Sequence, residues 1–226
     1  VSKGVKVKIR QITFNGRKEL LEGKVRNKLK STKQMRFGRL FTPSKFIPKK
    51  YEEDKEKLIE LYNKNGFRDA VIASDTIIHN GDEKTIDVVM NIEEGPRYYI
   101  RNVTWDGNYL YTKEQLDKVF GLKKGDIYNP EEIQKRLEAN PGQDVSSLYM
   151  DDGYLYYNCR AVEKSIEGDS IDIEMRIFEG KQATINKIIL NGNTKTSDHV
   201  VLRELFTLPG QKFSKTEIIN TQRQLS

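Results

Sequence analysis

Apolar and polar residues alternate most clearly in two segments, 85–93 and 171–178. The apolar positions are Ile86, Val88, Met90 and Ile92 in the first segment, and Ile171, Ile173, Met175 and Ile177 in the second. A period of two predicts a β-strand with one buried face and one polar face. Each predicted sheet should therefore be covered by helices on one side only.

The same order of predicted elements runs through the chain twice and begins a third time. The apolar spacing Ile9, Ile12, Phe14 returns as Ile100, Val103, Trp105 and as Ile185, Ile188, Leu190. This spacing of three and then two breaks strict alternation, and it predicts a first strand with a bulge or an entry residue rather than a helix. Each complete unit closes with a hairpin, predicted over 69–78 with 85–93 and over 155–166 with 171–178.

Two helices are predicted between the first strand and the hairpin of each unit. In unit one they lie near 18–29, with Leu21, Val25 and Leu29 on one stripe, and over 51–64. In unit two Thr112 and Gln115 form a capping box ahead of the first helix. The second helix of unit two should be broken at Pro141 into 130–139 and 144–151.

Glycine landmarks set the period of the repeat. Gly95 and Gly180 are 85 residues apart, as are Gly107 and Gly192, while Gly66 and Gly153 are 87 apart. A period of this length suits a small self-sufficient domain better than a solenoid turn. The predicted organisation is unit one over 1–96, unit two over 97–182, and the first half of a third unit over 183–226. We expect the chain to be a piece of a longer protein.

Charge is distributed unevenly along the chain. The net charge is +6, yet the first 50 residues hold 16 lysines and arginines against Glu19 and Glu22 only. Such a segment is either a solvated basic face or a surface for lipid headgroups, an acidic protein or nucleic acid. It includes an insertion at 31–50 whose possible interaction residues are Arg36, Phe37, Arg39, Phe41 and Lys45. Mixed basic and aromatic residues can stack on single-stranded nucleic acid, or the apolar ones can pack beneath the loop.

No constellation of residues indicates catalysis, a metal or a cofactor. His79 and His199 have no second histidine or cysteine at ligand spacing, and the chain has one cysteine, Cys159, which reads as a small buried apolar residue. Asp151 and Asp152 precede a Gly-Tyr turn and read as a helix end. No phosphate-binding glycine loop or nucleophile elbow is present. We therefore predict a protein that is not an enzyme and has no cofactor. No apolar run reaches the length of a membrane span.

The order strand, helix, helix, strand, strand, with a glycine and an aromatic residue after the second helix and a glycine closing the last strand, resembles the POTRA domain. The resemblance implies an α+β fold in which a three-stranded mixed sheet of order one, three, two carries two helices on one face.

At least three successive units resemble assembly proteins of the BamA type more than two-partner-secretion transporters. The implied location is the periplasmic face of the outer membrane. The implied partners are unfolded outer-membrane protein precursors, accessory subunits and a membrane barrel later in the same chain. Nucleic acid is not expected, although a nucleic-acid-binding module on residues 1–50 stays open as the alternative.

The resemblance also makes the second strand of each unit an exposed edge, which can pair with an extended segment of another protein. The candidate edge residues are Val71, Ile72, Ala73 and Ser74 in unit one, and Tyr156, Asn158, Arg160 and Val162 in unit two. In unit two Leu155, Tyr157, Cys159 and Ala161 should form the covered face. Residues 184–226 lack a closing hairpin, so we expect them to be less ordered or completed by a neighbouring molecule.

Overall fold

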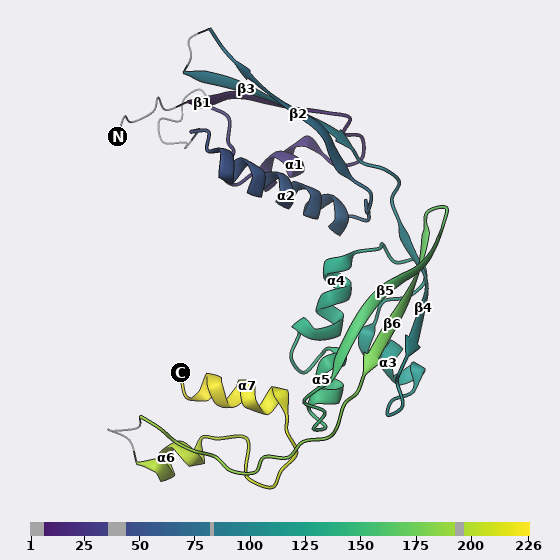
Figure 1. Ribbon diagram of the computed structural model, residues 1–226, viewed down its shortest axis with the longest axis vertical. Helices are drawn as coiled ribbons and strands as arrows, with labels where there is room; N and C mark the ends of the chain where they lie inside the picture. The colour runs from purple at the N-terminus through teal and green to yellow at the C-terminus, as the bar shows by residue number, and fades with distance from the viewer. Residues whose placement is uncertain (1–6, 36–43, 82–83, 193–196) are drawn as a thin grey trace. The chain divides into compact units, whose positions relative to one another are not determined.

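The computed structural model describes residues 7–35, 44–81, 84–192 and 197–226. The chain divides into two compact units, Val1–Tyr98 with Ile127–Asn129, and Tyr99–Asp126 with Pro130–Ser226 (Figure 1). Each unit contains one three-stranded sheet. The described helices include none that is long and apolar enough to cross a membrane.

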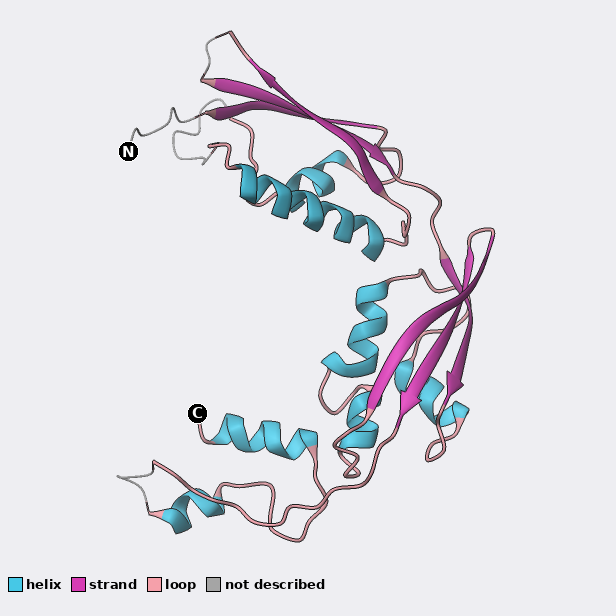
Figure 2. Ribbon diagram, viewed as in Figure 1, coloured by secondary structure: helices cyan, strands magenta, loops and turns pink. Residues whose placement is uncertain are grey.

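The first unit has the predicted order of elements. They are β1 (Lys8–Asn15), α1 (Glu22–Lys28), α2 (Pro48–Lys64), β2 (Val71–His79) and β3 (Thr85–Glu93). The sheet order is β1-β3-β2, with β1 parallel and β2 antiparallel to the central strand. Both helices lie on one side of the sheet (Figure 2). The alternating residues of β3 supply the centre of the core, because Ile86, Val88 and Met90 are fully buried against that helical side.

Two details of the unit one helices differ from the sequence prediction. Leu21 is 77% exposed, whereas Leu20 is buried with Val25 and Leu29. Leu21 is the extended residue just before α1, so the helical stripe does not include it. Helix α2 begins at Pro48 rather than Tyr51, since a proline is well suited to the first position of a helix.

The second unit repeats this arrangement with a broken second helix. Its elements are β4 (Tyr99–Asp106), α3 (Lys113–Phe120), α4 (Pro130–Gln134), the π-helical turn η1 (Lys135–Ala139), α5 (Val145–Met150), β5 (Asn158–Glu167) and β6 (Ser170–Phe178). The sheet order is β4-β6-β5, with the same parallel and antiparallel pairings. The predicted α+β fold, the break at Pro141 and the capping box of Thr112 with Gln115 are confirmed. Tyr149 is fully buried, as is Tyr62 in unit one.

Of the two predicted explanations for the spacing of three and then two, a bulge and an entry residue, the bulge is present in both β1 and β4. The register shifts between Ile9 and Gln11 in β1, and between Ile100 and Asn102 in β4, so Arg10 and Arg101 are the extra residues. Each arginine forms an ion pair with an aspartate of the central strand, Arg10 with Asp87 and Arg101 with Asp172. The extra residue therefore places a cation on the open face of the sheet in both units.

The third repeat forms two helices, α6 (Asp198–Arg203) and α7 (Lys215–Gln224), but the strand predicted at Ile185 to Leu190 is wrong. In the complete repeats the first strand pairs with the last strand of the same repeat, and the 226 residues do not include that partner for the third. Residues of the third repeat are instead hydrogen-bonded to the end of helix α5 in the second repeat. Asp151 accepts hydrogen bonds from the Ser214 hydroxyl at 2.9 Å and from the Thr216 amide at 2.8 Å.

Candidate functional site

The same set of backbone hydrogen bonds covers the outer edges of β1 and β4 and recurs on the corresponding segment of the third repeat, which is not a strand. In unit one Ile9 N donates to Ser44 O, Met35 N to Ile9 O, and Phe46 N to Val7 O. The matching bonds elsewhere are Ile100 N to Asp126 O, Gly125 N to Ile100 O and Tyr128 N to Tyr98 O, then Ile185 N to Gln211 O, Gly210 N to Ile185 O and Phe213 N to Ala183 O. The segment between the two helices thus covers this edge.

This pattern locates the insertion of unit one. Gly125 and Asp126 are consecutive, whereas their counterparts Met35 and Ser44 are separated by residues 36–43. Of the proposed interaction loop, Arg36, Phe37, Arg39 and Phe41 lie outside the described residues. Lys45 forms an isolated bridge with Lys8 at the β1 edge.

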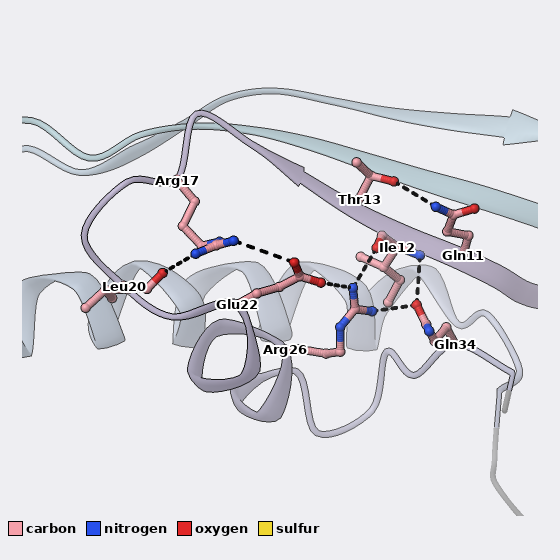
Figure 3. A network of polar contacts seen from close by, with 8 residues as sticks. All are labelled: Gln11, Ile12, Thr13, Arg17, Leu20, Glu22, Arg26 and Gln34. Atoms are coloured by element: carbon pink, nitrogen blue, oxygen red, sulfur yellow. Dashed lines mark hydrogen bonds and ion pairs between the residues drawn. The ribbon is translucent and has the colours of Figure 1, made fainter.

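Side chains close the β1 edge further along (Figure 3). The amide oxygen of Gln34 accepts a hydrogen bond from Ile12 N at 3.3 Å, and the guanidinium of Arg26 donates to Ile12 O at 2.9 Å. Arg26 is held in turn by Gln34 and by Glu22. Both polar backbone groups of Ile12 are therefore satisfied, and β1 offers no pairing position there.

The opposite edge of each sheet is formed by β2 or β5, each of which pairs with the central strand alone in the described part of the chain. In unit one Val71 is 47% exposed, Ala73 and Ser74 are exposed, and Ile72 is half-buried. Ala73 lies at a bulge between Ile72 and Ser74. The candidate residues of unit one therefore lie on a free edge, at its bulged beginning.

The unit two candidates are only partly in the edge strand. Asn158, Arg160 and Val162 are in β5, opposite Phe178, Arg176 and Glu174 on the open face. Tyr156 precedes the strand and is 66% exposed, because residues 154–157 form a turn in which Tyr157 N donates to Tyr154 O. The assignment of Tyr156 to the edge strand is therefore wrong.

The covered face of β5 is narrower than predicted. Ala161 lies opposite Met175, so it shares the covered face, yet it is exposed while Met175 is fully buried. A methyl group at the edge of the sheet is too short to reach the helical layer. Cys159 is the buried residue of this strand.

The ladder determines which backbone groups point away from the sheet. Tyr99 N donates to Asp169 O, so Asp169, Ile171, Ile173 and Met175 direct their backbone groups toward β4, and the residues between them face β5. Asn158, Arg160 and Val162 lie opposite those intervening residues and bond inward. The backbone groups of Cys159 and Ala161 therefore point outward. By the same reasoning those of Asp75 and Ile77 point outward from β2.

Helix α2 supports the middle of the β2 edge. The Tyr51 hydroxyl donates a hydrogen bond of 2.7 Å to Asp75, and Lys55 approaches the same carboxylate at 3.2 Å. Desolvation alone would raise the pKa of Asp75, but these bonds lower it below its ordinary value. Asp75 is thus held as a carboxylate bonded to α2 while its backbone remains turned outward.

The β5 edge includes the one cysteine of the chain, Cys159. Burial raises the pKa of Cys159 to about 11, so its thiol is protonated at neutral pH and is a poor nucleophile. Within the described residues no group of three or more histidine, cysteine, aspartate or glutamate side chains can hold a metal ion.

Sequence reasoning missed two kinds of residue. One is the outward backbone pair Cys159 and Ala161, which only the strand register reveals. The other is the pair Gln34 and Arg26 that closes the β1 edge. No periodic signal marks either pair, although Gln34 lies within the insertion predicted at 31–50.

Comparison with known families agrees with the repeated fold. The family described as "POTRA: Surface antigen variable number repeat" matches residues 7–95, 98–180 and 183–226. The chain belongs to the POTRA family. Similar curated proteins include the outer membrane protein assembly factor BamA of Nitratidesulfovibrio vulgaris, 29% identical over the whole chain, and the putative outer membrane protein assembly factor of Treponema pallidum, 27% identical. The POTRA chain spans 28% and 26% of the length of these two relatives.

A solved structure supports the fold of the POTRA repeats. The POTRA3-5 region of Haemophilus influenzae BamA matches the chain with a TM-score of 0.71 at 17% identity, covering 100% of this chain and 87% of that one. At this identity the likeness shows the fold alone.

Proposed function

We propose that this POTRA tandem is the periplasmic region of an outer-membrane protein assembly factor. In this proposal the free edges of β2 and β5 receive extended segments of unfolded barrel precursors and accessory subunits. The observation that carries the proposal is the asymmetry of each sheet. The first-strand edge bears repeated hydrogen bonds to the chain itself, while the second strand has one neighbour in the described part of the chain. The names of the relatives as assembly factors point in the same direction.

Strand addition explains how one surface can accept many clients. The outward N–H and C=O groups of Cys159 and Ala161 can pair with the backbone of any extended segment. The exposed side chains of Asn158 and Arg160 add modest preference on the open face. Such an edge selects for the tendency to form a strand rather than for a particular sequence.

The proposed role is that of a scaffold without catalysis. The arrangement offers backbone edges, a protonated buried thiol and surface ion pairs, and such groups bind and position rather than activate a substrate. In the full protein the tandem would lie at the periplasmic face of the outer membrane, connected to a membrane barrel in the same chain.

Proline at Ala161 tests the edge directly. Ala161→Pro removes an outward donor and leaves the β6 ladder intact, and edge strands tolerate proline where the N–H faces solvent. The probe is a fluorescein-labelled synthetic peptide of alternating valine and threonine, followed by fluorescence anisotropy. Because one hydrogen bond contributes about 1 kcal/mol, the variant should bind about fivefold more weakly. Ala161→Ser keeps the donor and should bind as the parent does. Equal affinity for folded Ala161→Pro would refute pairing at this edge.

The basic first 50 residues favour one rival, a nucleic-acid-binding module. A single-stranded oligonucleotide titrated at several salt concentrations distinguishes it from the scaffold. Sub-micromolar affinity at about 0.15 M salt with a steep salt dependence would support the rival and contradict the scaffold proposal. The second alternative is the POTRA region of a two-partner-secretion transporter, which would share the free edges.

A further inference from the structure

A basic hollow of about 390 Å³ lies beside the outer edge of β4 in unit two. It is bounded by Arg101, Asn102 and Val103 of β4, by the outward side of α3, and by the loop after α3. Its charged lining residues are Arg101, Lys113, Asp117, Lys118, Lys123 and Lys124. This hollow is on the first-strand side of the sheet, so it is separate from the free β5 edge.

The corresponding position in unit one is closed. Val103 corresponds to Ile12, since both follow the bulge and pair with the second apolar residue of the central strand. In unit one Gln34 supplies an acceptor for the Ile12 N–H and Arg26 supplies a donor for its C=O (Figure 3). The Ile12 backbone thus has one hydrogen bond of each polarity.

At the positions of unit two that correspond to Arg26 and Gln34, the side chains have the opposite hydrogen-bonding capacity. Arg26 corresponds to Asp117, and Gln34, which precedes Met35, corresponds to Lys124, which precedes Gly125. A carboxylate cannot donate to the Val103 C=O, and an ammonium group cannot accept from its N–H. Asp117 is engaged elsewhere, accepting a hydrogen bond of 2.8 Å from Trp105 Nε1 and an ion pair from Lys113. Val103 is 7% exposed, and its outward backbone groups have no side-chain partner among the described residues.

The hollow also has unbalanced positive charge. Arg101 is paired with Asp172 and Glu167, and Lys113 with Asp117. Lys118, Lys123 and Lys124 are exposed and form no ion pair within the described part of the chain. Lys118 lies in the last turn of α3, where the helix dipole already favours a cation. The positive charge that indicates an anionic ligand is therefore that of Lys123 and Lys124.

We propose that this hollow binds an acidic, extended peptide segment of a partner protein. One residue of an extended segment that runs antiparallel to β4 supplies both missing groups, its C=O to the Val103 N–H and its N–H to the Val103 C=O. Aspartate or glutamate side chains next to that residue meet Lys123 and Lys124. A phosphate group satisfies the lysines and the N–H, but the paired donor and acceptor of Val103 favour a backbone. The site does not depend on strand addition at β2 or β5.

Amide NMR of the 226-residue chain tests the proposal. The probe is the synthetic peptide acetyl-Thr-Glu-Val-Asp-Thr-Glu-amide, and the readout is the position of the Val103 signal, with the Ala161 signal reporting the other edge. The peptide should shift Val103, and the shift should weaken as salt is raised. Lys123→Gln with Lys124→Gln should weaken binding at least about fivefold, whereas Lys49→Gln with Lys50→Gln in unit one should leave it unchanged.

A second double variant introduces into unit two the two side chains that bond to the Ile12 backbone in unit one. Asp117→Arg with Lys124→Gln places the unit one side chains beside Val103 and should abolish the peptide-induced shift while Ala161 keeps its signal. An unshifted Val103 at millimolar peptide, or undiminished binding by the Lys123→Gln, Lys124→Gln variant, would overturn the proposal. A Val103 shift caused by inorganic phosphate or phosphatidylglycerol vesicles, with none caused by the peptide, would also overturn it and assign the hollow to phosphate groups. A shift at Ala161 alone would support the free edge and contradict this site.

Discussion

A β-carbon built on Gly107 would stand 2.2 Å from the carbonyl oxygen of Ile177. Gly16 has the same relationship with Ile92, at 2.1 Å. After the first strand the chain therefore passes against the backbone of the last strand, and both glycines have positive φ there. In both complete repeats this position is therefore glycine, because no side chain fits at the crossing.

Gly107→Ala should destabilise unit two by about 3 kcal/mol or more, because it adds a backbone clash to the cost of positive φ. The matched control is Gly192→Ala, since Gly192 also has positive φ but would place its β-carbon in open space. That control should cost about 1 kcal/mol. Urea unfolding followed by the fluorescence of Trp105 measures both. Similar losses for the two variants would contradict the proposed crossing.

The ion pair at the β4 bulge should make unit two sensitive to acid. Arg101 donates to Asp172 at 2.6 Å and, with the Ser165 hydroxyl, lowers the pKa of that carboxyl from 3.8 to about 2. A lowered pKa stabilises the fold above the unfolded value, and this contribution is lost as pH falls from 3.8 toward about 2. Asp172→Asn should therefore be less stable than the parent at neutral pH, and the difference should shrink across that window. A difference that is independent of pH between neutrality and pH about 2 would argue against the ion pair.

Asp54 anchors the start of the insertion to α2. It is fully buried, and its Oδ2 accepts hydrogen bonds from Ser31 N at 2.8 Å and Thr32 N at 2.7 Å. Asp54→Ala leaves two donors unsatisfied and should cost about 2–4 kcal/mol in the free energy of unfolding of unit one. Lys57→Ala removes only a partly exposed ion pair at 3.5 Å and should change stability by less than about 1 kcal/mol. Calorimetry of the two variants provides the comparison.

Much of the fold was predictable because each repeat carries its own local signals. The alternation of Ile86 and Ile171 with polar neighbours marks the central strands, and the spacing of Ile9 and Ile12 marks the bulge. Both patterns are defined by the two-residue period of a β-strand, which the first follows and the second breaks, so they can be read from the order of apolar and polar residues. The strand predicted at Ile185 to Leu190 did not form, because a strand also needs a partner.

The candidate site was less accessible to sequence reasoning. Alternation indicated that the Arg160 side chain lies on the open face of the sheet. The direction of each backbone N–H depends on the ladder register, and this register turns the backbone of Ala161, rather than that of Arg160, away from the sheet. Closure of the β1 edge by Gln34 depends on a contact between residues 22 positions apart. Neither relationship leaves a periodic trace in the chain.

Hydrogen exchange at β5 tests the central claim most directly. In the free protein the amides of Cys159 and Ala161 should exchange quickly, because they point away from the sheet, while those of Arg160 and Val162 are protected by the ladder with β6. With the alternating valine and threonine peptide bound, the account predicts that Cys159 and Ala161 become protected and that Arg160 and Val162 change little. Peptide binding that leaves the exchange of Cys159 and Ala161 unchanged would contradict strand addition at this edge.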